Sequence, residues 1–255
     1  MHRQAPRRPA RQWRRQARGA LVALSFWGPA CGFTVSADTI TSARFTEPTT
    51  RYAHGVLGDN IEYGALELSV QSAHNPPRHS VLTVRLAKDR VFEDLAPRLV
   101  DVDGDGSPEA IVVESQAQQG AQLAIYNAKG QKIAATPHIG TRFRWLAPVG
   151  AADLDGDGQV EIAYIDRPHL AKILRIWRFE NDHLAEIATV PDLTNHRIGE
   201  DFISGGLRDC GDDRDIILVS GTWARIVRVS YQDGWTRSDL GPFSGAASLA
   251  RALKC

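Results

Sequence analysis

Two short loops of matching spacing carry the residues of this sequence that are best placed to do chemistry. They span residues 101–109 and 153–161, and each has carboxylates at positions 1, 3, 5 and 9 and glycines at positions 4 and 6. The carboxylates are Asp101, Asp103, Asp105 and Glu109 in the first loop, and Asp153, Asp155, Asp157 and Glu161 in the second. Such spacing lets hard oxygen donors converge on one point, which is the chemistry of a cation site.

Calcium is the cation that this donor set favours. It takes six to eight oxygens in a flexible shell, and a backbone carbonyl at position 7, from Ser107 or Gln159, would add to the carboxylates. Four crowded carboxylates without a cation would repel one another and raise their own pKa values. An ordinary Asp/Gly turn is the alternative, which two matched copies disfavour. An EF-hand is excluded because position 12 is Val112 or Tyr164 instead of glutamate.

Beyond residue 37 the chain is rich in short β-type runs separated by turn residues. Strands are predicted over residues 65–70, 81–86, 110–113, 123–126, 161–165, 173–179, 216–219 and 226–231. Asn, Asp and Gly at residues 127–130, 181–182 and 232–234 tolerate the left-handed conformations of hairpin turns. We therefore expect an antiparallel meander.

The meander repeats with a long period. Asp101 and Asp153 lie 52 residues apart, and Asp209 opens an altered third copy 56 residues further on. A fainter first copy over residues 55–68 brings the count to about four units. Four strands per unit fit the blade of a small β-propeller, in which closure protects the sheet edges. We expect an all-β fold of four blades, with five as the alternative count and a β-sandwich or unclosed hairpins as alternative folds.

The motif D-x-D-G-D-G-x-x-E followed by a strand resembles the calcium loops of FG-GAP or VCBS repeats, the blades of integrin-α-type propellers. The resemblance covers roughly residues 52–243 and implies that the four carboxylates of each loop ligate calcium. The third copy, residues 209–215, departs from the pattern because it is two residues shorter and contains Cys210 and Arg214. We expect no metal in that copy.

The first 37 residues resemble a signal peptide. They contain seven arginines and no acidic residue, then an apolar core over residues 20–27 and small residues before a cleavage point at Ala37. A basic arm for nucleic acid or membrane is the alternative. Arg14 and Arg15 leave the export route open between Sec and twin-arginine. Lipidation of Cys31 is disfavoured, because no leucine stands three residues before it.

Cleavage would leave residues 38–255 as a single domain with 23 basic and 30 acidic residues, a net charge of −7. That acidic excess argues against nucleic acid as a partner. Two cysteines would remain, Cys210 and Cys255, an even count that permits a disulfide in an oxidising compartment. The sequence thus predicts a periplasmic or secreted protein.

No catalytic motif stands out, and the histidines are scattered along the chain. The leading hypothesis is a non-enzymatic, calcium-stabilised binding or scaffold module of the cell envelope that meets a protein or glycan as a monomer without a membrane span. The alternatives are an envelope hydrolase with its site in the propeller channel, or a purely structural domain. Four tryptophans could line a ligand surface or pack between blades: Trp145, Trp177, Trp223 and Trp235.

Overall fold

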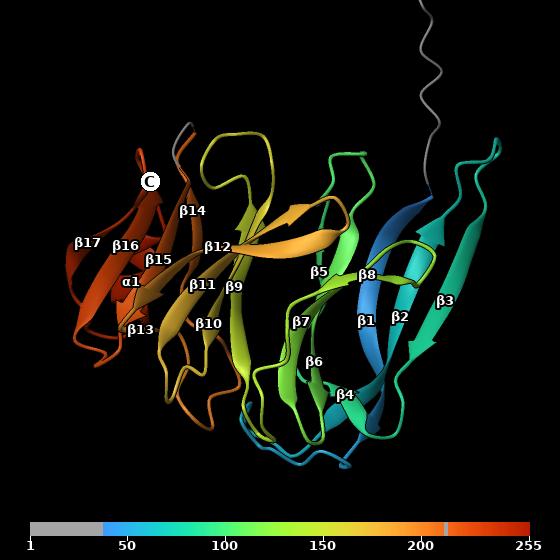
Figure 1. Ribbon diagram of the computed structural model, residues 1–255, viewed down its shortest axis with the longest axis horizontal. Coiled ribbons are helices and arrows are strands. Elements are labelled where there is room, and N and C mark those ends of the chain that lie inside the picture. Colours follow the sequence, from blue (N-terminus) through green and yellow to red (C-terminus); the bar gives the residue numbers. More distant parts are fainter. Residues whose placement is uncertain (1–37, 212–213) are drawn as a thin grey trace, which may run out of the picture. The chain divides into compact units, whose positions relative to one another are not determined.

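The computed structural model describes residues 38–211 and 214–255, which form antiparallel β-sheets and one short helix (Figure 1). The signal peptide predicted over residues 1–37 lies outside this part of the chain. Among the described residues, no helix has the length and apolar character needed to cross a membrane.

The first sheet follows the strand order β1-β2-β4-β6-β7-β8, with β3 paired to β2 and β5 paired to β6. Its strands are β1 (Thr39–Thr49), β2 (Glu62–Gln71), β3 (His79–Arg85), β4 (Arg90–Phe92), β5 (Arg98–Val100), β6 (Glu109–Gln116), β7 (Gly120–Tyr126) and β8 (Lys132–Ala135). Its central strands β6 and β7 are buried along almost their whole length.

The second sheet is a four-stranded meander in the order β12-β11-β10-β9, and the third follows β13-β15-β16-β17 with β14 also paired to β15. Their strands are β9 (Leu146–Ala152), β10 (Glu161–Asp166), β11 (Ile173–Glu180), β12 (His183–Pro191), β13 (Leu193–Thr194), β14 (Gly206–Asp209), β15 (Arg214–Ser220), β16 (Arg225–Tyr231) and β17 (Trp235–Pro242). The helix α1 (Ala246–Ala252) follows the last strand.

One unit occurs three times in these sheets: a hairpin around an Asp-rich loop, then two further antiparallel strands. Its outer strand is continuous in β9 but divided into β4 and β5 in the first sheet and into β13 and β14 in the third. The predicted repeat is therefore present as repeated meanders. The faint first copy is not a separate sheet, because Tyr63 of β2 pairs with Phe92 of β4 and joins it to the next unit.

All eight predicted strands are present, and the strands that the sequence did not reveal are short or polar, apart from β9. β1, β12 and β17 lie at sheet edges and expose many side chains, so they lack the apolar runs that mark central strands. β9 contains Pro148, which an edge strand tolerates; Pro148 pairs with Tyr164 where the register shifts.

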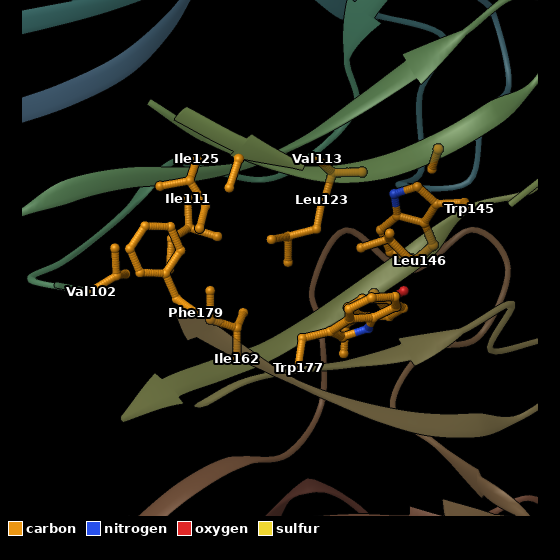
Figure 2. Packing of buried hydrophobic residues seen from close by; sticks show 14 of the residues in the cluster. Val102, Ile111, Val113, Leu123, Ile125, Trp145, Leu146, Ile162, Trp177 and Phe179 are labelled. Carbon is orange, nitrogen blue, oxygen red and sulfur yellow. The ribbon is translucent and has the colours of Figure 1, made fainter. Parts of the chain in front are cut away.

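Neighbouring sheets share hydrophobic cores. Figure 2 shows Ile111 and Leu123 of the first sheet facing Ile162 and Phe179 of the second, and all belong to one buried cluster. A second cluster joins the second and third sheets. Among the described strands, no ladder joins the third sheet to the first. Trp145 and Trp177 belong to the first cluster with 2% and 9% exposure, so both pack in the core.

Candidate metal centre

The two acidic loops are the connections of tight hairpins. The first loop joins β5 to β6, and the second joins β9 to β10. Val100 pairs with Glu109, and Ala152 pairs with Glu161. The strand register therefore places the glutamate at position 9 beside the aspartate at position 1 in both loops.

Hydrogen bonds to carboxylates shape the first loop. Asp101 accepts the backbone N–H of Gly104 at 2.8 Å through Oδ1 and that of Gly106 at 2.9 Å through Oδ2. Glu109 Oε2 accepts from Val102 N at 3.1 Å. Gly104 and Gly106 adopt φ of 75° and 87°, which glycine reaches without a Cβ penalty. The loop thus curls around Asp101.

The second loop repeats this arrangement bond for bond. Asp153 accepts from Gly156 N at 2.7 Å and from Gly158 N at 3.1 Å, and Glu161 accepts from Leu154 N at 2.8 Å. The two glycines have φ of 80° and 87°. Two segments of different sequence therefore share one loop geometry.

Three carboxylates converge in each loop. We call Asp101, Asp103 and Glu109 the first triad, and Asp153, Asp155 and Glu161 the second triad. Within each triad, one oxygen from every residue lies within 4.8 Å of the others. Calcium binds oxygens at about 2.3–2.6 Å, so two ligands on opposite sides of the ion are about 5 Å apart. Both triads therefore have the donor type and spacing to hold calcium.

The remaining predicted carboxylates, Asp105 and Asp157, are not among the converging groups. Asp105 Oδ1 accepts from Ser107 N at 2.7 Å, and Asp157 Oδ1 accepts from Gln159 N at 2.9 Å. The hydroxyl of Ser107 donates to the carbonyl of Asp38 at 3.0 Å, and ligation by the backbone carbonyls of Ser107 and Gln159 stays a prediction. Asp105 and Asp157 thus support the loop backbone, while the triads offer converging oxygens.

The first triad has perturbed acidity. Burial raises the pKa of Glu109 to about 7, an effect that Val102 N–H opposes and the charges of Asp103 and Asp105 reinforce. Burial is also the main cause of the raised pKa of Asp103. Calcium ligation requires the carboxylate form, so occupancy of this loop would be favoured above neutral pH.

The second triad already has a cation beside it, and sequence spacing gave no indication of this. Arg178 of β11 pairs with Glu161 in the strand register. Its Nε lies 2.9 Å from Glu161 Oε1, its Nη1 lies 3.0 Å from Asp157 Oδ2, and its Nη2 contacts Asp155 Oδ2. Burial raises the pKa of Glu161 as well, and the hydrogen bonds from Leu154 N–H and Arg178 offset only part of that rise.

The third copy is fastened by a disulfide. Cys210, directly after β14, is bonded to Cys255 with the two Cα atoms 5.7 Å apart. Arg214 Nε lies 3.3 Å from Asp209 Oδ2, so the two side chains form an ion pair. Among the residues described in this copy, which exclude 212 and 213, no acidic group meets the spacing of a metal site.

Three histidines that are distant in sequence meet near one small cavity. His169 and His196 are hydrogen-bonded at 3.0 Å, and His196 Nε2 donates to the carbonyl of Glu200 at 3.0 Å. His196 Nδ1 is therefore the acceptor, and His169 Nε2 the donor. Burial lowers the pKa of His169 to about 4. His54 and His169 line a cavity of about 30 Å³, far smaller than the roughly 300–1,000 Å³ of typical ligand pockets, which favours a structural role.

His54 contacts one of two buried acids, Glu62 and Glu93, which lie where β2 pairs with β4. Its Nδ1 lies 2.5 Å from Glu93 Oε1, and Ser115 donates to the other carboxylate oxygen. Burial, followed by the charge of Glu93, raises the pKa of Glu62 to about 9. The folded protein therefore holds a proton on Glu62 at neutral pH.

Glu62→Gln should flatten the dependence of stability on pH. The unfolded chain releases the Glu62 proton near pH 4.5 and the folded protein near pH 9, so folding stability is lost as pH rises between these values. In saturating calcium we expect the variant to be close to wild type at pH 5 and to exceed it by roughly 4 kcal/mol at pH 8. Urea unfolding at both pH values measures this.

Glu67→Gln on the same strand is the matched control, because Glu67 is only partly buried and pairs with the exposed Arg44. We expect it to change stability by less than about 0.5 kcal/mol at either pH. Equal stability of Glu62→Gln and wild type at pH 8 would contradict the prediction.

Repeated antiparallel meanders, each with a short loop before its central strand and two of them with converging carboxylates, define an all-β repeat protein with loops suited to a cation. Residues 101–164 match the model of the FG-GAP-like repeat family. The chain therefore contains an FG-GAP-like repeat over these residues. The matched span contains both acidic loops and ends within β10. Comparison with curated proteins found no match.

Proposed function

We propose that this chain is an exported, calcium-stabilised, non-enzymatic module with β-propeller-like blades that binds a protein or glycan of the cell envelope. The observation that carries the proposal is the pair of matched carboxylate triads at equivalent hairpins. FG-GAP-like repeats are the family context. Each meander would serve as one blade, and calcium bound at a carboxylate triad would hold that hairpin loop closed.

Export to an oxidising compartment is supported by the bond between Cys210 and Cys255, since structural disulfides persist in such compartments. The signal-like N-terminus is consistent with the same route. Periplasmic or secreted localisation is therefore part of the proposal.

A glycan-sized ligand has a place on the described surface. A cavity of about 200 Å³ is lined by aromatic and charged side chains that include Tyr164, Trp177, Asp166 and Arg175. The rings of Tyr164 and Trp177 are stacked with centroids 6.4 Å apart. Both rings are almost wholly buried, so a ligand in this cavity would meet mainly the polar groups of Asp166 and Arg175, which can hydrogen-bond sugar hydroxyls.

Calcium should raise the melting temperature of the full chain relative to chelator. A ligand that binds only the folded state at 100 times its Kd contributes about 2.7 kcal/mol, a shift of several degrees for a protein of this size. Asp103→Ala removes one oxygen donor of the first triad and should reduce that shift. Thermal unfolding in calcium and in excess chelator measures it.

Asp201→Ala provides the control, because Asp201 is exposed and belongs to neither loop. This variant should keep the full calcium-dependent shift. Identical melting of wild type in calcium and in chelator would remove the basis for the proposal.

A further inference from the structure

The two acidic loops share one backbone geometry but differ in the residue that faces them from the neighbouring strand. In the second sheet, Arg178 stands opposite Glu161. In the first sheet, Ala110 pairs with Tyr126, and continuing that antiparallel register by one step places Asn127 opposite Glu109. A guanidinium and a neutral amide thus occupy equivalent positions.

The guanidinium of Arg178 binds the oxygens that calcium would need. It forms ion pairs with Asp155, Asp157 and Glu161, and these include two members of the second triad. The Glu161 side chain is fully buried and that of Arg178 is 19% exposed. A dication that displaced the guanidinium would leave a poorly hydrated arginine next to a second positive centre, which is costly in a low-dielectric site.

The charged residues that line the cavities beside the two loops also differ. A cavity of about 100 Å³ beside the second loop is lined by Arg214 and Arg228, and Arg214 Nη1 donates to the carbonyl of Asp153 at 3.2 Å. The cavity of about 470 Å³ beside the first loop is lined instead by two further acids, Asp38 and Asp182, with one lysine. Two arginines therefore offset the acids beside the second loop, including Asp215, whereas a single lysine lines the cavity beside the first loop.

Asn127 cannot take the role of Arg178 in the first loop. Its side-chain oxygen accepts the backbone N–H groups of Lys129 and Gln131 at 3.0 and 3.1 Å, so it stabilises its own turn. Within the described part of the chain, no arginine or lysine forms an ion pair with the carboxylates of the first triad. Among the described residues, no basic side chain therefore neutralises the carboxylates of the first triad.

We propose that Arg178 replaces calcium as the counter-ion of the second loop, so that the chain has one high-affinity calcium site, in the first loop. This inference rests on the proposed function, because it presumes that the first triad binds calcium. The side chain that faces the loop glutamate from the third strand of the unit decides whether the carboxylates are neutralised by an internal guanidinium or by a bound ion. Arg178 thereby determines which of the two acidic loops binds the cation.

Exchange of the two facing residues tests this on the full chain by isothermal titration calorimetry with calcium chloride. Wild type should bind one equivalent with high affinity. Arg178→Asn should gain a second equivalent with at least tenfold tighter affinity than any weak second binding in wild type. Asn127→Arg should weaken the first site at least tenfold. Arg175→Asn is the matched control on the same strand, because Arg175 pairs with Asp166 and Glu186, and it should retain one equivalent.

Two single substitutions in the wild-type background locate the site without altering Arg178. Asp103→Asn should abolish high-affinity binding, and Asp155→Asn should leave it unchanged. Two equal equivalents in wild type, or loss of binding in Asp155→Asn but not in Asp103→Asn, would overturn the inference and leave the proposed function intact. Absence of calcium binding in both wild type and Arg178→Asn would overturn the proposed function itself.

Discussion

Replacing Cys210 with serine should lower the free energy of unfolding by about 4 kcal/mol, because the bond to Cys255 closes a loop of 45 residues and removes the corresponding entropy from the unfolded chain. The bond holds the segment after α1 against the hairpin of β14 and β15. Urea unfolding under non-reducing conditions measures the loss.

The variants Cys210→Ser, Cys255→Ser and the double substitution should lose equal amounts of stability, because each removes the same bond. Reductant should destabilise wild type by a similar amount and leave the three variants unaffected. If reductant leaves the unfolding curve of wild type in place, the bond does not contribute to stability in solution.

Truncation of Leu123 to alanine should cost about 3–4 kcal/mol. The side chain is fully buried in the cluster between the first and second sheets, and it faces the second sheet in Figure 2. Leucine-to-alanine changes in a close-packed core lose transfer free energy and leave a cavity. The loss should appear in a single unfolding transition, since the sheets share that core.

Leu170→Ala is the same chemical change at a side chain that is 60% exposed, and it should shift stability by no more than about 0.5 kcal/mol. Chemical denaturation monitored by both tryptophan fluorescence and circular dichroism checks the two variants together. Separate transitions for the two probes in Leu123→Ala would mean that the sheets unfold independently.

The acidic loops could be predicted from sequence because their geometry is local. Carboxylates and glycines within nine residues determine the N–H bonds to Asp101 and the positive φ of Gly104, and the same spacing gives the same loop at Asp153. Strands with continuous apolar runs, such as β6 and β10, were predictable for a similar reason: burial on both faces leaves a strong pattern.

The features that sequence did not reveal depend on strand register and tertiary contacts. Arg178 lies 23 residues from Asp155, and only the pairing of β10 with β11 brings it to the loop. β4 is three residues long, so no periodicity could show that it joins β2 to β6. The contact of His169 with His196 likewise requires two loops to meet.

Each sheet has one loop directly before its central strand, and the three loops are held closed in different ways. On the proposed assignment, the first connection is fastened by calcium, the second by an internal guanidinium, and the third by the bond of Cys210 with Cys255. A reducing cytosol with little free calcium would leave the first and third open, whereas an exterior compartment supplies both conditions. Passage across the membrane would then act as a maturation step, and the second loop is the one of the three connections that would require neither calcium nor oxidation.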